Sequence, residues 1–121
     1  MLRLALATMT VAAAATVLYL VPAWGSSPAL VGEVGPGFTI ELKNAAGKDL
    51  KTIRAGTYRI KVEDKATIHN FHLIGPGLNM KTGVSFKGDT IWTIKLRPGR
   101  YTYQCDPHAT RGMKGQFTVT S

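Results

Sequence analysis

The stretch "TIWTIKLRPGRYTYQC", residues 90–105, alternates apolar and polar side chains on both sides of a short turn. One parity of the two segments carries Trp92, Ile94, Leu96, Tyr101, Tyr103 and Cys105. Alternation with a period of two residues predicts strands that bury one face. The turn "RPG" predicts that the two strands pair as a hairpin. Cys105 is then expected to point inward at the end of the second strand.

Segments of the same kind follow one another from residue 30 onward. They comprise residues 38–43, 58–63, 66–74 and 115–120, and turn residues such as those of "NAAGKD", "GPGLN" and "FKGD" separate them. No sustained apolar stripe of helical period occurs in this part of the sequence. Short strands at this spacing predict an all-β fold, a Greek-key β-sandwich built from antiparallel strands.

The loop "CDPHATRGM", residues 105–113, contains the only cysteine of the chain. A lone buried cysteine often serves as a small apolar side chain. Here, however, a short loop between two strands also carries His108 and Met113, so the three side chains are expected to converge. A thiolate, an imidazole and a thioether form a soft donor set that suits copper. A single cysteine excludes iron–sulfur clusters and dithiolate copper centres.

A copper site of this kind needs a second histidine, and "IHNFHL", residues 68–73, offers His69 and His72. His69 shares its parity with Phe71 and Leu73, which favours it as the inward-facing residue. A register slip of one residue would exchange the two faces, so both histidines stay open as ligands. Asn70 is expected to hydrogen-bond to the ligand loop and hold it in place.

The order His-Asn, followed 36 residues after the histidine by Cys-x2-His-x4-Met, resembles the cupredoxins, the small blue copper proteins. The spacing within the loop is similar to that of plastocyanin and pseudoazurin. The resemblance implies one copper ion in a type 1 site, held by His69, Cys105 and His108 with Met113 as a weak axial ligand. It also implies that His108 lies near the surface and passes electrons, ringed by Pro107 and by "IGPG" at residues 74–77.

The function that the resemblance implies is one-electron transfer through Cu(II)/Cu(I), and no enzymatic activity. Copper storage or delivery with the same ligands is the alternative. Nucleophilic catalysis by Cys105 has less support, because no oxyanion site or orienting carboxylate beyond Asp106 is evident. The formal charge of +8 favours a redox partner with an acidic docking surface. We expect a monomer that does not bind nucleic acid.

The first 25 residues read as a leader and not as part of the fold. They begin with Arg3, continue through a long apolar run and end in small residues before Ser26. This pattern predicts a signal peptide at residues 1–25, a single domain at residues 26–121 and a periplasmic or extracellular location. A retained membrane anchor is the alternative, because the apolar run is long enough to span a bilayer.

Overall fold

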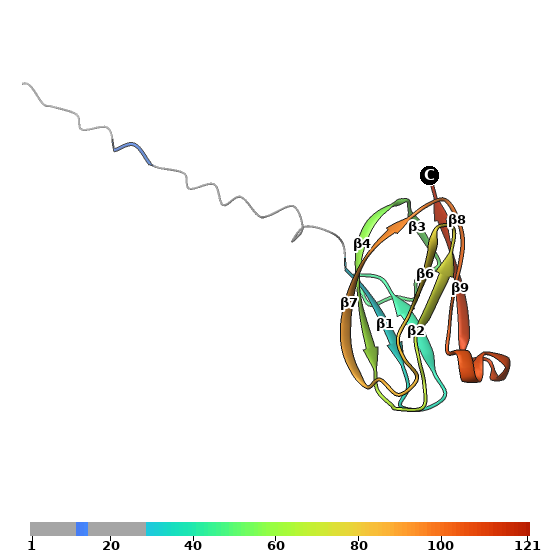
Figure 1. Ribbon diagram of the computed structural model, residues 1–121. Coiled ribbons are helices and arrows are strands. Elements are labelled where there is room, and N and C mark those ends of the chain that lie inside the picture. The colour runs from blue at the N-terminus through green and yellow to red at the C-terminus, as the bar shows by residue number, and fades with distance from the viewer. Residues whose placement is uncertain (1–11, 15–28) are drawn as a thin grey trace, which may run out of the picture.

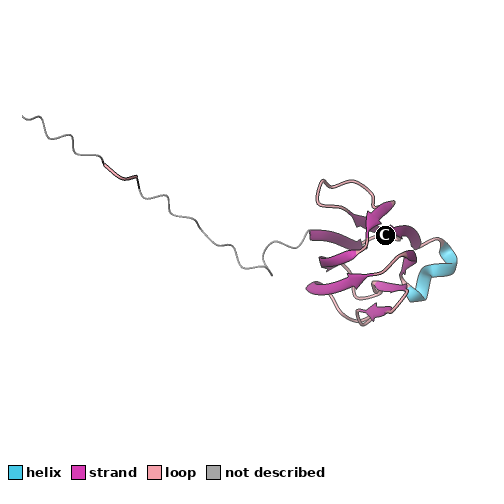
Figure 2. Cartoon of the chain, turned by 90° about the horizontal axis from the view of Figure 1, so that it is seen from above, coloured by secondary structure: helices cyan, strands magenta, loops and turns pink. Residues whose placement is uncertain are grey.

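The computed structural model describes residues 12–14 and 29–121, and the second range forms a sandwich of two β-sheets (Figures 1 and 2). The predicted all-β sandwich is therefore confirmed. The predicted leader and its cleavage position before Ser26 lie outside the described residues, apart from residues 12–14. Within the described ranges, no helix has the length and apolar character needed to cross a membrane.

Four strands form one sheet and five strands form the other. The first sheet has the order β2-β1-β4-β7, with β1 at Ala29–Val34, β2 at Ile40–Lys43, β4 at Gly56–Asp64 and β7 at Gly88–Leu96. The second has the order β3-β9-β8-β5-β6, with β3 at Thr52–Arg54, β5 at His72–Gly75, β6 at Leu78–Lys81, β8 at Gly99–Gln104 and β9 at Lys114–Thr120. A 3₁₀-helix, η2 at Asp106–Arg111, joins β8 to β9.

Both sheets are mixed, which corrects the expectation of antiparallel strands throughout. β1 pairs in parallel with β4, and β3 pairs in parallel with β9. The chain makes a hairpin from β1 to β2, crosses to the other sheet as β3 and returns as β4 beside β1. Alternation specifies which face of a strand is buried and does not specify its neighbours, so the sequence pattern could not reveal these parallel pairs.

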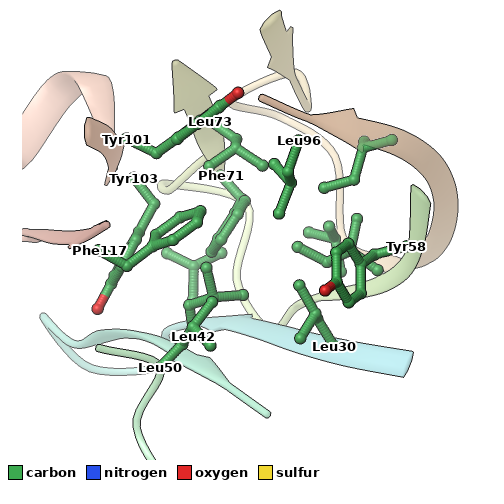
Figure 3. Close-up of a cluster of buried hydrophobic side chains, with 14 of the residues drawn as sticks. Leu30, Leu42, Leu50, Tyr58, Phe71, Leu73, Leu96, Tyr101, Tyr103 and Phe117 are labelled. Atoms are coloured by element: carbon green, nitrogen blue, oxygen red, sulfur yellow. The ribbon is translucent and has the colours of Figure 1, made fainter. Parts of the chain in front are cut away.

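The core lies between the sheets and consists of the apolar parity of the strands (Figure 3). The predicted alternation is confirmed where the strands are long. The buried apolar residues of β4, β7, β8 and β9 are Tyr58, Ile60, Val62, Ile94, Leu96, Tyr101, Tyr103, Phe117 and Val119. Figure 3 shows Tyr101, Tyr103 and Phe117 together on one side of this cluster, with Leu30 and Tyr58 on the other. Cys105 continues the buried parity of β8 and is also fully buried.

The predicted hairpin between residues 90–96 and 100–105 is wrong. β7 pairs with β4, whereas β8 pairs with β5 and β9 in the opposite sheet. The "RPG" turn therefore carries the chain from one sheet to the other. Gly99 has a φ of 141°, and a Cβ atom at this position would lie 2.7 Å from Pro76 Cγ. The crossing therefore requires a residue without a side chain.

Tyr101 fastens this crossing. Its ring is fully buried and stacks on Phe117, with the ring centroids 5.2 Å apart. Its hydroxyl donates to the Pro76 carbonyl oxygen at 2.9 Å and accepts from the Arg97 amide at 3.0 Å. One side chain thus satisfies two backbone groups of two different loops and holds the end of β5 against the β7–β8 connection.

We expect Tyr101→Phe to lower the free energy of unfolding by about 1–3 kcal/mol, because two backbone groups lose their partner. Urea unfolding of the metal-free protein measures this change. Tyr103→Phe is the matched control on the same strand, since its hydroxyl makes no hydrogen bond to the described part of the chain. Equal effects of the two substitutions would contradict the role given to Tyr101.

Candidate metal centre

Three potential metal ligands from distant parts of the sequence converge at one end of the sandwich. His69 lies between β4 and β5, Cys105 directly follows β8, and His108 belongs to η2. The Nδ1 atoms of His69 and His108 are 3.1 Å apart. The Cys105 Sγ atom lies 3.7 Å from His69 Nδ1 and 3.5 Å from His108 Nδ1. The three donor atoms therefore face a common point.

Met113 is buried almost as completely as His69 and Cys105. His69 and Cys105 have no exposed surface, Met113 is 1% exposed, and His108 is half-buried. The backbone of Met113 is tied to the other loop residues, because its carbonyl accepts from the Cys105 amide at 3.0 Å and its amide donates to the His108 carbonyl at 3.3 Å. Met113 thus lies inside the protein at the end of the loop that carries two of the three donors.

The loop is more ordered than the sequence predicted. The sequence predicts a loop at residues 105–113, but residues 106–111 form the 3₁₀-helix η2, which Figure 1 shows as a short coil next to the start of β9. Pro107 stands in the first turn, where its missing N–H leaves no helical hydrogen bond unmade. Gly112 ends the helix with a φ of 91°, a conformation that glycine adopts at little cost.

Asn70 joins the segment of His69 to the loop of Cys105. Its Oδ1 accepts from the Asp106 amide at 2.7 Å, and its Nδ2 donates to Asp106 Oδ2 at 2.9 Å and to the Thr82 carbonyl at 3.3 Å. Asn70 is itself buried. The hydrogen bond that the sequence predicted between Asn70 and the ligand loop is confirmed.

His72 stands apart from the three donors. Its ring lies on the outer face of β5, with Nδ1 2.8 Å from Asp106 Oδ1 and Nε2 2.6 Å from Asn79 Oδ1. The group of side chains that could share a metal ion contains His69, Cys105 and His108 and does not include His72. Between the two histidines that the sequence left open, the geometry favours His69.

The reason for this preference differs from the one predicted. The segment 66–74 was expected to be one continuous strand, but β4 ends at Asp64 and β5 begins only at His72. His69 and its neighbours Asn70 and Phe71 are all buried, so strict alternation fails there. Alternation holds from Phe71 onward, where Leu73 faces the core and His72 faces outward.

Phe38 is a component of the site that sequence reasoning missed. Its parity in the alternating segment 38–43 predicts an inward position, but β2 begins at Ile40 and Phe38 is 58% exposed. Its ring packs edge-on against both imidazoles, with centroids 4.8 Å from His108 and 5.5 Å from His69. The only sequence feature that could have indicated this role is the apolar residue that directly follows "GPG" and precedes the strand.

The segment 74–77 does not ring His108, which corrects the expectation drawn from the resemblance. His72 pairs with Gln104, next to Cys105, whereas Ile74 pairs with Thr102. Because β5 and β8 are antiparallel, Pro76 lies farther along, beside Tyr101 and Gly99. These residues lie at the opposite end of β8 from Cys105. Phe38 occupies the place next to His108 instead.

The electrostatics of the site favour a neutral imidazole at His108 and an ionised carboxylate at Asp106. Partial burial lowers the pKa of His108, and the charges of His69 and Arg111 lower it further. Partial burial alone would raise the pKa of Asp106, but hydrogen bonds from Gln104, Asn70 and His72 lower it to about 2. A neutral histidine keeps a nitrogen lone pair available for a metal.

The residues present fit a copper ion. Metal–nitrogen and metal–sulfur bonds of about 2.0–2.3 Å place ligand atoms about 3–4 Å apart, which agrees with the three separations between the donors. One thiolate with two imidazoles is the in-plane donor set of blue copper sites. Among the described residues, the buried side-chain atoms without a hydrogen-bond partner are Arg59 Nε, Asp64 Oδ2 and His69 Nε2. Burial raises the pKa of Asp64, whereas the hydrogen bond from the Ala66 amide and the charge of His69 act in the opposite direction.

Comparison with known proteins agrees with this donor set. The pattern that describes copper binding proteins of the plastocyanin/azurin family matches residues 33–120. A structure of reduced rusticyanin is 27% identical, with a TM-score of 0.58 over 76% of this chain and 78% of that one. Rusticyanin from Thiobacillus ferrooxidans is 26% identical, with a TM-score of 0.54 over 76% of each chain.

An oxidised amicyanin variant shares the fold, at 17% identity and a TM-score of 0.51 over 78% of this chain and 92% of that one. The family match covers most of the chain and includes all three converging donors. Together these findings identify the cofactor as a single copper ion in a type 1 site. The chain belongs to the plastocyanin/azurin family of copper-binding proteins, the cupredoxins.

Proposed function

We propose that this protein is an exported electron carrier whose copper ion is held by His69 Nδ1, Cys105 Sγ and His108 Nδ1, with Met113 as a weak axial ligand. The convergence of the thiol sulfur and the two imidazole nitrogens within 3.1–3.7 Å of one another carries the proposal. When bound, copper supplies a one-electron couple between Cu(II) and Cu(I). The chain's own residues hold the donor atoms in place around the ion.

Those residues hold one arrangement of donors that suits both oxidation states. Asn70 ties the His69 segment to the Cys105 loop, and the backbone bonds within residues 105–113 fix the positions of His108 and Met113. A donor set held in this way changes little when one electron arrives or leaves. The burial of His69, Cys105 and Met113 leaves little space for a substrate beside the sulfur. These features support a carrier and not an enzyme.

The electron is proposed to enter and leave through His108. His108 is half-buried, whereas the other proposed ligands are buried. Phe38 covers the imidazoles with an exposed ring and offers an apolar surface to a partner. Close apolar contact at this point excludes water and shortens the path from the partner to the metal.

Cys105→Ser tests the ligand assignment directly. The purified wild-type protein loaded with one equivalent of Cu(II) should show an intense thiolate-to-copper band in the red part of the visible spectrum, and the variant should lose it. Tyr103→Phe, two residues away, should keep the band. A colourless one-to-one copper complex of the wild-type protein would contradict the proposal. Rapid loss of copper to a mild chelator would instead favour storage or delivery.

The charges of the two sheets support an acidic redox partner. The four-stranded sheet carries the acidic residues Glu33, Glu41, Glu63, Asp64 and Asp89, and four ion pairs neutralise part of them. In the described strands of the five-stranded sheet there is no acidic residue, while Arg54, Lys81, Arg100 and Lys114 are exposed. Lys114 pairs with Gln104 at the end of the sheet that carries the copper ligands. This face would attract an acidic surface toward His108.

Raising the ionic strength should slow electron exchange with an acidic redox protein, because salt screens attraction between exposed charges. Stopped-flow measurement of the second-order rate constant at several salt concentrations checks this. Lys114→Glu should reduce the low-salt rate constant several-fold. Lys95→Glu, an equal charge reversal on β7 of the other sheet, should reduce it less. A rate constant that is independent of salt would contradict docking through charge.

Export is proposed from the leader pattern of residues 1–25. Full-length protein expressed in a bacterium with a functional secretion pathway should appear outside the cytoplasm with Ser26 as its first residue, because the small residues before it suit a signal peptidase. Mass spectrometry of the intact protein measures the mature end. Recovery of uncleaved protein in the membrane fraction would establish an anchor instead, and uncleaved cytoplasmic protein would contradict export.

A further inference from the structure

We infer that His72 is a positioning residue that clamps the copper-ligand loop to the outer edge of the five-stranded sheet through Asp106. The inference rests on the proposed ligation by Cys105 and His108. It assigns a role to the third histidine of the chain, which does not belong to the converging donors. The clamp consists of His72, Asn79, Gln104 and Asp106.

The Asp106 carboxylate is the centre of the clamp. Its Oδ1 lies 2.8 Å from His72 Nδ1 and 2.9 Å from Gln104 Nε2, and its Oδ2 accepts from Asn70 Nδ2 at 2.9 Å. An ionised carboxylate only accepts hydrogen bonds, so His72 donates to Asp106 from Nδ1. Nε2 then either donates to Asn79 Oδ1 or accepts from the Asn79 amide turned by 180°. Hydrogen bonds to a charged acceptor are stronger than those between neutral groups.

His72 connects this carboxylate to a further strand. Its Nε2 lies 2.6 Å from Asn79 Oδ1, and Asn79 belongs to β6, the edge strand of the sheet. The imidazole thus bridges β6 and the start of η2, with both ring nitrogens engaged. The His72 side chain is only 14% exposed, whereas the Asp106 carboxylate that it contacts is 34% exposed.

Asp106 is the main attachment of η2 to the body of the protein. In the described part of the chain, the backbone hydrogen bonds of residues 105–113 outside the strands join members of that segment to one another or to Lys114. The described hydrogen bonds that join η2 to β5 or to the Asn70 segment include those of side chains. All of them involve Asp106, apart from the contact between the two ligand histidines. Asp106 directly follows Cys105, so its position sets the direction in which the sulfur-bearing residue leaves β8.

The role of His72 is distinct from that of Asn70. Asn70 is buried beside His69 and holds the inner oxygen and the amide of Asp106. His72 holds the outer oxygen from the solvent side of the sheet. Without His72, Asp106 retains two side-chain donors, but the loop loses its connection to β6. The expected consequence is a looser loop in a folded protein.

His72→Ala and His72→Gln test the clamp, and Gln116→Ala is the matched control because Gln116 lies exposed on β9 of the same sheet. Hydrogen exchange of the Asp106 amide in the metal-free protein is the first measurement. His72→Ala should accelerate it about tenfold, the effect of losing one hydrogen bond to a charged group. His72→Gln, which can still donate to Asp106, should restore part of the protection.

Copper affinity and spectrum are the second measurement. His72→Ala should weaken Cu(II) binding about tenfold, the lower end of the effect of losing an outer-shell partner. It should also change the ratio of the two thiolate-to-copper bands, which a merely structural substitution would not alter. In an Asp106→Ala background the same substitution should have almost no further effect, because the two residues act through one contact.

The outcomes separate this inference from the proposed function. A wild-type protein that binds copper without a blue band would contradict the proposed ligation, while the hydrogen-exchange result would still decide whether the clamp exists. A blue wild-type protein with His72→Ala indistinguishable from Gln116→Ala in exchange, affinity and spectrum would overturn the clamp. Additive effects of His72→Ala and Asp106→Ala would overturn it as well.

Discussion

The hydrogen bonds between Asn70 and Asp106 join the two segments on which the metal centre depends. One segment, between β4 and β5, carries His69, and the other, between β8 and β9, carries Cys105 and His108. These segments are far apart in the sequence, and their side chains meet only if both loops keep a definite position. The buried Asn70 amide donates to one carboxylate oxygen of Asp106 and accepts from the Asp106 backbone N–H. These two hydrogen bonds together fix the position of one loop relative to the other. The donor separations of 3.1–3.7 Å follow from this junction.

The strands contribute a rigid frame around the junction. β8 ends at Gln104, so Cys105 continues its inward parity, and Tyr101 fastens the other end of the same strand to the loops at Arg97 and Pro76. Fixing both ends of β8 limits movement of the sulfur along the strand. Electron transfer benefits from such a frame, because a donor set that does not rearrange presents little barrier to a change of charge on the metal.

Charge and apolar surface are separated on this molecule. The exposed aromatic ring of Phe38 lies over the imidazoles, whereas the exposed cations Arg54, Lys81, Arg100 and Lys114 lie along the five-stranded sheet. Long-range attraction and short-range contact are thus provided by different residues. Attraction of this kind speeds the encounter, and the small apolar contact lets the complex separate after the electron has moved.

The sequence by itself determined the chemistry and the class of fold. One cysteine with His108 and Met113 at their spacing, and His69 beside Asn70, specify a soft donor set, and alternation over 58–63 and 115–120 specifies strands with one buried face. These properties depend on side-chain type and on period, both of which are local. Pro107 in the first turn of η2 and Gly112 at the end of this helix are compatible with η2, but neither residue requires it.

Only the tertiary structure decided which strands are neighbours and which histidine faces the sulfur. The turn at residues 97–99 looked like a hairpin, yet it changes sheet because Tyr101 and Pro76 hold it there. Phe38 looked buried, yet it covers the imidazoles because β2 starts two residues later. His72 could have been a ligand until Asp106 and Asn79 were found on either side of its ring. Each of these outcomes depends on contacts between residues distant in sequence, and a local pattern carries no information about such contacts.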